Sequence, residues 1–162
     1  MSSNNVGVLV DNTGYNQAAF IGINAINTLS LGDSEYKLSL FYKNLSYSCT
    51  KLASVSTTLD KIYHFNGTLI ATNLDLAAYM IKAYTPKLRI LYVYELEWAK
   101  ENYDMDYVKY FNILNNRDIK IVAPSRFYAE AVKNFCGREV DAVVPQFNIT
   151  EIIHALCDAK SV

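Results

Sequence analysis

Short, mainly apolar runs recur along this chain, and longer segments with helical spacing separate them. A run of this kind suits a strand that is buried on both faces of a parallel sheet, because such a strand has no polar face. Strands that alternate with helices form a parallel sheet with helices on both faces. The sequence therefore predicts an α/β fold: a single Rossmann-like domain with a mostly parallel sheet of about six strands. The predicted strands are Val6–Val10, Tyr36–Tyr42, Gly67–Ala71, Leu88–Tyr94, Ile119–Ala123 and Val140–Val144.

The segments between these runs carry the signals of helix ends. Thr72 and Asp75 form a pair typical of a capping box, so we expect a helix to begin there. Ser125 and Gly137 are a typical N-cap and C-terminal residue for a helix between them. Lys61–Phe65 is interpreted as a short edge strand. Further helices are expected at Gln17–Leu29, near Asp106–Asn116 and at Ile149–Leu156.

Length and composition limit the class of protein. A chain of 162 residues with 51% hydrophobic and 19% charged residues can bury one full core and is not disordered. We expect a Rossmann-like domain over residues 1–147 and a C-terminal linker and helix over residues 148–162. The formal charge is −1 and the basic residues are scattered, so no nucleic-acid partner is expected.

The chain begins with a short apolar run and no basic region before it, so neither a signal peptide nor a membrane span is predicted. Cys49, Cys136 and Cys157 cannot all pair, which favours a reducing compartment. The expected location is the cytoplasm.

No cofactor or metal ion is expected from the motifs. The first loop is not GxGxxG, which argues against a dinucleotide site. His64 and His154 have no further ligand at metal-binding spacing. Asp104 and Asp106 spell DxD, but both precede a helix, where acids satisfy free N–H groups.

The segment Ile119–Phe147 (IKIVAPSRFYAEAVKNFCGREVDAVVPQF) has a strand, a serine, a helix, a glycine and a strand that leads into a proline-containing linker. In this order it resembles the end of the N-terminal, acceptor-side domain of GT-B glycosyltransferases of the family 4-like group. Ile70–Lys82 and Leu88–Trp98 resemble the strands that carry acceptor-side residues in that family. The resemblance extends from Gly67 to Phe147, about half of the chain.

The resemblance implies half of a GT-B fold. Family members continue into a second domain that holds the sugar nucleotide and, in retaining enzymes, an E-x7-E pair, and this sequence contains neither. The expected function is therefore glycosyltransferase-like: the domain transfers or binds sugar with a separately encoded donor domain or a second copy of itself. The expected ligands are a sugar acceptor or a nucleotide-sugar. The alternative is a catalytically inactive module that binds a sugar or a protein. A flavodoxin-like binding module also fits the periodicity but explains Ile119–Phe147 less well.

Asn12, Thr13, Gly14 and Tyr15 follow the first predicted strand and precede a helix. Free N–H groups and the helix dipole attract anions and polyols at such a place, and ligands of open α/β sheets bind there. These four residues are candidate substrate-binding residues. An ordinary turn that uses Asn and Gly for their backbone tolerance remains the alternative.

Glu95, Glu97 and Trp98 follow the most strand-like run. Residues two apart in extended chain point the same way, so two like charges there can raise one pKa and create a general base. The resemblance implies the same role, because an acid from this half activates the acceptor hydroxyl in inverting relatives. Trp98 is a candidate platform for a sugar ring, and Ser125 completes the substrate-binding set. The alternative is a solvated loop whose aromatic residue packs on the core.

Ile149, Ile152, Ile153 and Leu156 form an apolar stripe near the C-terminus. This stripe either docks on the domain's own sheet or is buried against another chain. Together with the thirteen tyrosines and the missing donor half, it leads us to expect a homodimer.

Overall fold

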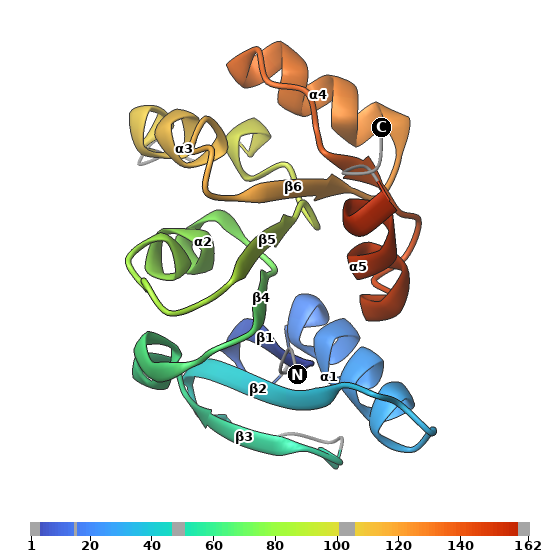
Figure 1. Ribbon diagram of the computed structural model, residues 1–162. Coiled ribbons are helices and arrows are strands. Elements are labelled where there is room, and N and C mark those ends of the chain that lie inside the picture. The colour runs from blue at the N-terminus through green and yellow to red at the C-terminus, as the bar shows by residue number, and fades with distance from the viewer. Residues whose placement is uncertain (1–3, 15, 47–50, 101–105, 159–162) are drawn as a thin grey trace.

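The computed structural model describes residues 4–14, 16–46, 51–100 and 106–158, in which strands alternate with helices (Figure 1). The strands are β1 (Asn5–Asn12), β2 (Lys37–Asn44), β3 (Val55–Thr58), β4 (Thr68–Ala71), β5 (Leu88–Tyr92), β6 (Lys120–Ala123) and β7 (Ala142–Val143). The α-helices are α1 (Gln17–Ser30), α2 (Leu74–Ile81), α3 (Tyr107–Leu114), α4 (Arg126–Cys136) and α5 (Ile149–Asp158). Two 3-10 turns, η1 (Leu59–His64) and η2 (Glu97–Ala99), lie between them.

All seven strands form one sheet in the order β3-β2-β1-β4-β5-β6-β7, and every neighbouring pair is parallel. β1 lies inside the sheet, where Val8 stands opposite Leu40 of β2 and Ile70 of β4. The strand order reverses at β1, with β2 and β3 to one side and β4 to β7 to the other. The predicted Rossmann-like α/β fold is confirmed, with one strand more than expected.

The additional strand lies in the Ser- and Thr-rich segment before residue 60. β3 pairs with β2 at the sheet edge, whereas Lys61–Phe65, predicted as that edge strand, lies mostly in η1. Leu59 and Ile62 explain the difference. In extended chain, residues three apart point to opposite faces, but a 3-10 turn places both on one side. Here both are buried in the same core layer.

The start of α2 differs from the predicted capping pair by one residue. Asn73 is the N-cap, and its side-chain oxygen accepts a hydrogen bond from Leu76 N at 2.8 Å. The Thr72 hydroxyl instead donates to the Leu9 carbonyl oxygen at 3.0 Å and ties β4 to β1. The other predicted helix ends are confirmed: Ser125 caps α4, and Gly137 ends it with φ of 77°, in the left-handed region.

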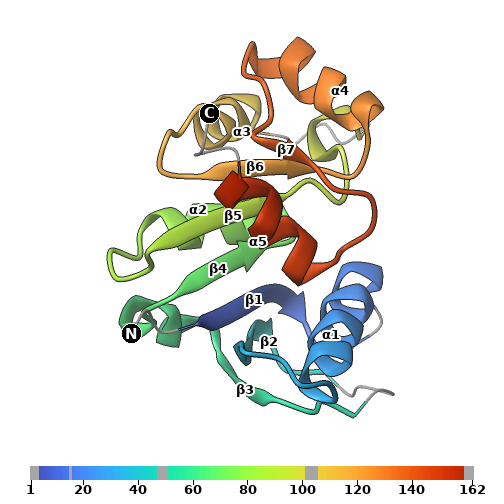
Figure 2. The ribbon, with the colours of Figure 1, turned by 45° about the vertical axis from the view of Figure 1, so that its right-hand side comes forward.

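The helices cover the sheet in two layers (Figure 2). α1 and α5 lie on one face, over side chains such as Val8 and Ile90. η1, α2, α3 and α4 cover the other face, over side chains such as Leu9 and Leu69. Gly7 also points to this second face, where a Cβ would lie 2.6 Å from the Phe41 ring. The absence of a side chain at Gly7 therefore lets Phe41 pack directly over β1.

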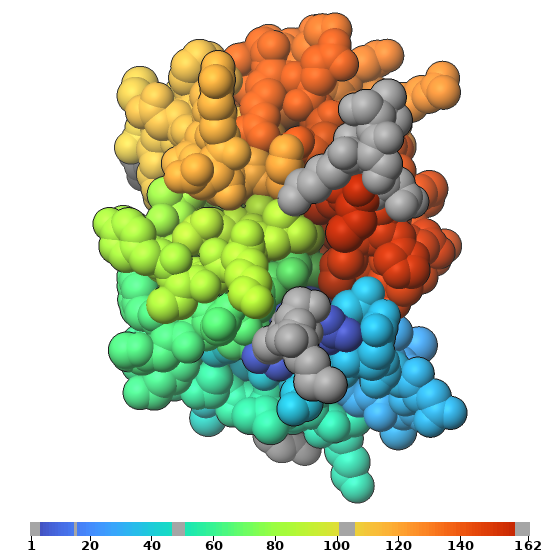
Figure 3. All heavy atoms as spheres, in the orientation of Figure 1, coloured from blue at the N-terminus to red at the C-terminus, as the bar shows by residue number. Residues whose placement is uncertain are grey.

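The apolar stripe of α5 docks on the protein's own sheet. Ile149, Ile152 and Leu156 are buried in the same layer as α1, and Ile153 packs against that layer. In Figure 3 the red atoms of α5 lie between the blue atoms of α1 and the orange atoms of α4. The stripe therefore gives no support to the expected dimer, which stays a prediction. Within the described ranges, no helix is long and apolar enough to cross a membrane.

Candidate functional site

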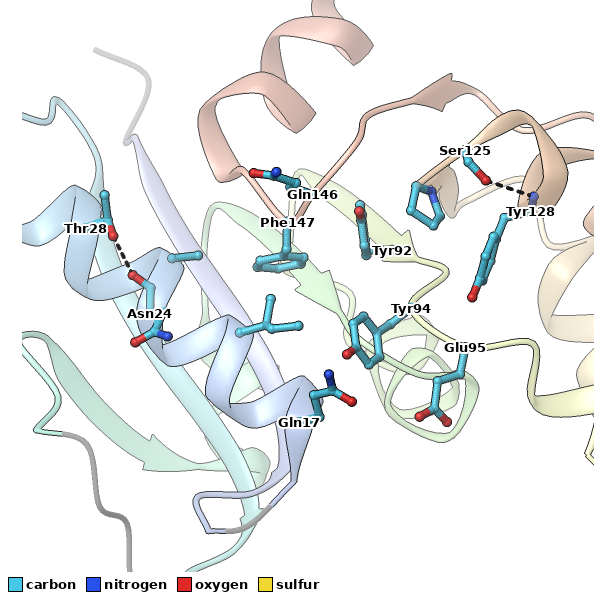
Figure 4. Close-up of a pocket in the computed structure, with 13 residues that line it drawn as sticks. Gln17, Asn24, Thr28, Tyr92, Tyr94, Glu95, Ser125, Tyr128, Gln146 and Phe147 are labelled. Carbon is cyan, nitrogen blue, oxygen red and sulfur yellow. Dashed lines mark hydrogen bonds between the residues drawn. The ribbon is translucent and has the colours of Figure 1, made fainter.

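A pocket of about 840 Å³ opens at the carboxyl edge of the sheet, on the face that carries α1 and α5 (Figure 4). Ligands of open α/β sheets bind at this edge, in the crevice where the strand order reverses. One wall comes from α1, and the others come from the segments that follow β5, β6 and β7. The lining residues are Gln17, Ile21, Asn24, Ala25, Thr28, Tyr92, Tyr94, Glu95, Pro124, Ser125, Tyr128, Gln146 and Phe147.

Tyr92 and Phe147 fix the inner part of the pocket. The buried Tyr92 hydroxyl donates to the Val144 carbonyl oxygen at 3.1 Å, and its ring meets Phe147 edge to face at 5.1 Å. Burial raises the pKa of Tyr92 to about 12, with smaller contributions from Tyr128 and Tyr94, so its side chain is a neutral phenol at physiological pH. The segment after β7 is thereby held against the end of β5.

Gln146 has a backbone conformation that is uncommon for its residue type. Its φ is 63°, in the left-handed region, and it is the one non-glycine residue with positive φ in the part of the chain that the structure describes. The Asn148 N–H donates to its carbonyl oxygen at 3.0 Å and closes the turn. Strained residues of this kind cluster at ligand sites. Here the strain directs the chain from β7 into α5 along the pocket wall.

Glu95 is the one carboxylate of the described pocket lining, and no Lys, Arg or His lines it. Its side chain is 48% exposed and forms an ion pair with Lys100. Gln17 lies across the opening from Glu95, and Tyr94 and Tyr128 lie on either side (Figure 4). The arrangement offers a solvent-accessible acid beside aromatic rings, amides and hydroxyls.

Glu97 has different partners from Glu95. η2 begins at Glu97 and ends the extended chain, and both carboxylate oxygens of Glu97 accept from the Leu74 N–H, at 3.1 and 3.0 Å. Glu97 thus lies at the N-terminus of α2 and does not line the large pocket. Burial raises its pKa to about 7, the Leu74 hydrogen bond limits the rise, and Asp75 adds to it. The predicted paired glutamates are not the cause of this raised pKa.

Asp11 also lies near this helix start. The Asn73 side-chain amide donates to the Asp11 carboxylate, and Asp75 occupies the first turn of α2. Burial raises the pKa of Asp11, whereas the Asn73 hydrogen bond and the charge of Lys43 lower it. The three acids, Asp11, Asp75 and Glu97, are accounted for by the positive end of the α2 dipole and its free N–H groups.

Two polar groups of the loop after β1 have hydrogen-bond partners within the protein. The Thr13 hydroxyl donates to the Ser46 carbonyl oxygen at 2.6 Å, and the Gly14 N–H donates to the Asn12 side chain at 3.0 Å. Asn12, Thr13 and Gly14 do not line the pocket, and Tyr15 lies outside the described residues. This geometry is that of an ordinary turn.

Trp98 stacks on Phe135 with ring centroids 4.9 Å apart and an interplanar angle of 20°. It packs against the layer of α2, α3 and α4, away from the pocket, so one face of its ring is already covered. Ser125 does line the pocket, and its hydroxyl accepts from Tyr128 N at 3.4 Å. Of the predicted site residues that the structure describes, only Glu95 and Ser125 therefore lie at the pocket.

Among the described residues, no three His, Cys, Asp or Glu side chains are placed to hold a metal ion. Asp106 accepts from Lys109 N at 2.9 Å as the N-cap of α3, as expected for an acid before a helix. Asp104 and Met105 lie outside the described residues.

Sequence reasoning did not identify most of the pocket lining. Tyr94 had a signal, since it stands directly before Glu95 at a strand end, and Gln146 and Phe147 follow the last strand in the same way. Gln17 and Tyr128 had none, because helix positions that face a pocket have the same pattern as positions that face water.

Comparisons of this chain with protein-family models, with curated proteins and with solved structures found no match. The class of this protein is therefore defined by its fold and its pocket alone. It is a Rossmann-like α/β domain with an all-parallel sheet and an open pocket at the carboxyl edge of the strands.

Proposed function

We propose that this chain is a glycosyltransferase-like domain that holds a sugar acceptor in the pocket between α1 and the ends of β5, β6 and β7. The observation that carries the proposal is the pocket lining, which combines aromatic rings with amides, hydroxyls and one carboxylate. Transfer needs a nucleotide-sugar donor, which a donor domain or a second copy of the chain supplies.

The lining suits a sugar because a sugar ring has apolar C–H faces and hydroxyl edges. Tyrosine rings cover apolar faces while their hydroxyls bond to polar edges. The amides of Gln17, Asn24 and Gln146 both donate and accept hydrogen bonds, as sugar hydroxyls require. A pocket of about 840 Å³ is within the size range of ligand sites.

Glu95 is the candidate catalytic base, since its carboxylate borders the pocket and reaches solvent. In the proposed reaction the Glu95 carboxylate takes the proton of the acceptor hydroxyl. The hydroxyl oxygen then forms a bond to the anomeric carbon of the donor, and the nucleoside diphosphate leaves with the electron pair of the broken bond between that carbon and the phosphate oxygen. Glu97 lies outside this step, because it does not line the large pocket and accepts from the Leu74 N–H at the start of α2.

A catalytically inactive module that binds a sugar or a protein is the second candidate. The observation that favours it is the ion pair of Glu95 with Lys100, since Lys100 then occupies the carboxylate that the acceptor hydroxyl has to reach. In this case the pocket binds its ligand and no bond is broken.

Two measurements on the full chain separate these functions. The first is ligand-observed NMR with a panel of mono- and oligosaccharides, which we expect to show binding that Tyr94→Ala weakens. The second is hydrolysis of UDP-, GDP- and ADP-sugars, which we expect Glu95→Gln to abolish. Glu139→Gln is the matched control, because Glu139 is also exposed and lysine-paired but does not line the pocket.

Sugar binding without hydrolysis shows that the chain, alone or with its own copies, binds sugar and breaks no bond, which leaves transfer only to an assembly with a separate donor domain. Absence of binding to every sugar in the panel refutes the proposed function.

A further inference from the structure

The charge carried by the described side chains that line the pocket is of one sign. Its described lining holds one carboxylate, Glu95, and no basic side chain. Lys100 is the cation paired with Glu95, so an anionic ligand competes with Glu95 for it. Arg126 follows Ser125 in the chain but is exposed and does not line the pocket. The lining therefore offers an anion no free cation.

The helix ends near the pocket do not compensate for this lack. A free helix N-terminus attracts phosphate through its N–H groups. At α1, however, the Asn16 side chain already accepts from Ala18 N at 2.8 Å. At α4, Ser125 accepts from Tyr128 N. The polypeptide's own side chains thus occupy donors that a phosphate would use.

The aromatic lining adds an attraction for positive charge. Tyr92, Tyr94, Tyr128 and Phe147 present four rings to one pocket, and the face of an aromatic ring attracts cations. Burial, followed by the charge of Glu95, raises the pKa of Tyr94, which keeps its ring neutral and its hydroxyl protonated. The aromatic rings and the Glu95 carboxylate therefore both favour a positively charged ligand.

We propose that the pocket selects its ligand by charge, so that it binds a sugar with an ammonium group more tightly than the neutral sugar and binds the phosphorylated sugar least. This inference rests on the proposed function, because it concerns the ligand of the same pocket. The ammonium group lies between the tyrosine rings and the Glu95 carboxylate, where it takes the place of the exposed Lys100 ammonium.

The test compares three ligands that share one ring: glucosamine, glucose and glucose 6-phosphate. Their dissociation constants are measured with the full chain by ligand-observed NMR at about pH 6, where an amine is protonated. A charge near a single partly exposed carboxylate changes affinity by about three- to tenfold. We therefore expect glucosamine to bind about three- to tenfold more tightly than glucose, and glucose 6-phosphate to bind more weakly than glucose.

Two variants assign the effect to the pocket. Glu95→Gln is expected to reduce the advantage of glucosamine to about twofold or less, the part that the aromatic rings supply. Glu139→Gln removes an exposed, lysine-paired carboxylate elsewhere and is expected to leave the ranking unchanged.

The outcomes distinguish this inference from the proposed function. If glucose 6-phosphate binds as tightly as glucose or more so, charge selection is refuted while sugar binding stands. If glucosamine and glucose bind equally, the inference is likewise refuted. If none of the three ligands nor any sugar of the panel binds, the proposed function is refuted and the inference falls with it.

Discussion

The carboxyl of Glu97 is expected to make the stability of this protein depend on pH. Its side chain is mostly buried at the N-terminus of α2, where burial raises its pKa from 4.5 to about 7. Glu97→Gln replaces the carboxyl by a neutral amide of the same shape. The amide oxygen can still accept the hydrogen bond from Leu74 N, and the titration is removed.

The folded protein holds the Glu97 proton up to about pH 7, whereas the unfolded chain releases it near pH 4.5. The stability that this proton contributes is therefore complete below about pH 4.5 and is lost as the pH rises through 7. At about 1.4 kcal/mol per pH unit, the interval corresponds to roughly 3 kcal/mol. The α2 dipole favours the carboxylate by roughly 0.5 kcal/mol. We therefore expect the unfolding free energy of the wild type to fall by about 2 to 3 kcal/mol between pH 4.5 and pH 7. Glu97→Gln should not show this fall.

The assay is urea unfolding of both proteins from about pH 4.5 to about pH 8, monitored by the fluorescence of Trp98. As the pH rises, the unfolding free energy of Glu97→Gln should increase relative to that of the wild type by about 2 to 3 kcal/mol. A constant offset from the packing of the amide cancels in this comparison. Glu95→Gln, in the exposed part of the same loop, is the control and should follow the wild type. Parallel pH profiles for wild type and Glu97→Gln would refute the reasoning.

Substitutions at four further positions test the packing. Gly7→Ala places a Cβ 2.6 Å from the Phe41 ring. This variant should lower the unfolding free energy, measured in urea, by about 1 to 3 kcal/mol. An unchanged unfolding free energy would show that Phe41 moves aside at no cost. Gly137→Ala meets no atom within 4 Å, so only its left-handed φ of 77° should cost stability, about 1 kcal/mol in the same assay, and Gly137→Asn should cost less. Ile152→Ala in the buried stripe of α5 should cost about 2 to 5 kcal/mol. Ile153→Asp should lower the melting temperature without changing the sedimentation of the protein. If the wild type is a dimer and this variant splits it, the docking of α5 on its own sheet is contradicted. Sedimentation of the wild type as an 18 kDa monomer would refute the predicted homodimer.

Most of the sheet could be predicted from the sequence because its strands are buried on both faces. A run such as Val6–Val10 has no polar face, and only a covered parallel strand accepts that composition. β3 has two faces of Ser, Thr and Val at an edge, with no apolar run to mark it. The position of β3 is determined by its pairing with β2, and the local sequence carries no information about that pairing.

The candidate site was only partly predictable for a related reason. The strand ends were predicted to within a few residues, which placed Glu95 and Ser125 correctly at the carboxyl edge. The orientation of the Glu97 side chain depends on η2, a turn of three residues that no sequence pattern predicts. The positive φ of Gln146 also has no local signal, since glycine or asparagine is the usual residue there.

The position of α5 has a consequence for the synthesis of the chain. α5 follows every strand, yet Ile152 and Leu156 share one core layer with Val6 and Val8 of β1. A nascent chain therefore exposes the part of that face which α1 does not cover until α5 emerges. Contacts between such distant segments also slow folding, because the long loop between them must close first. Chaperones that bind exposed apolar strands should engage this protein during translation and release it once α5 has docked.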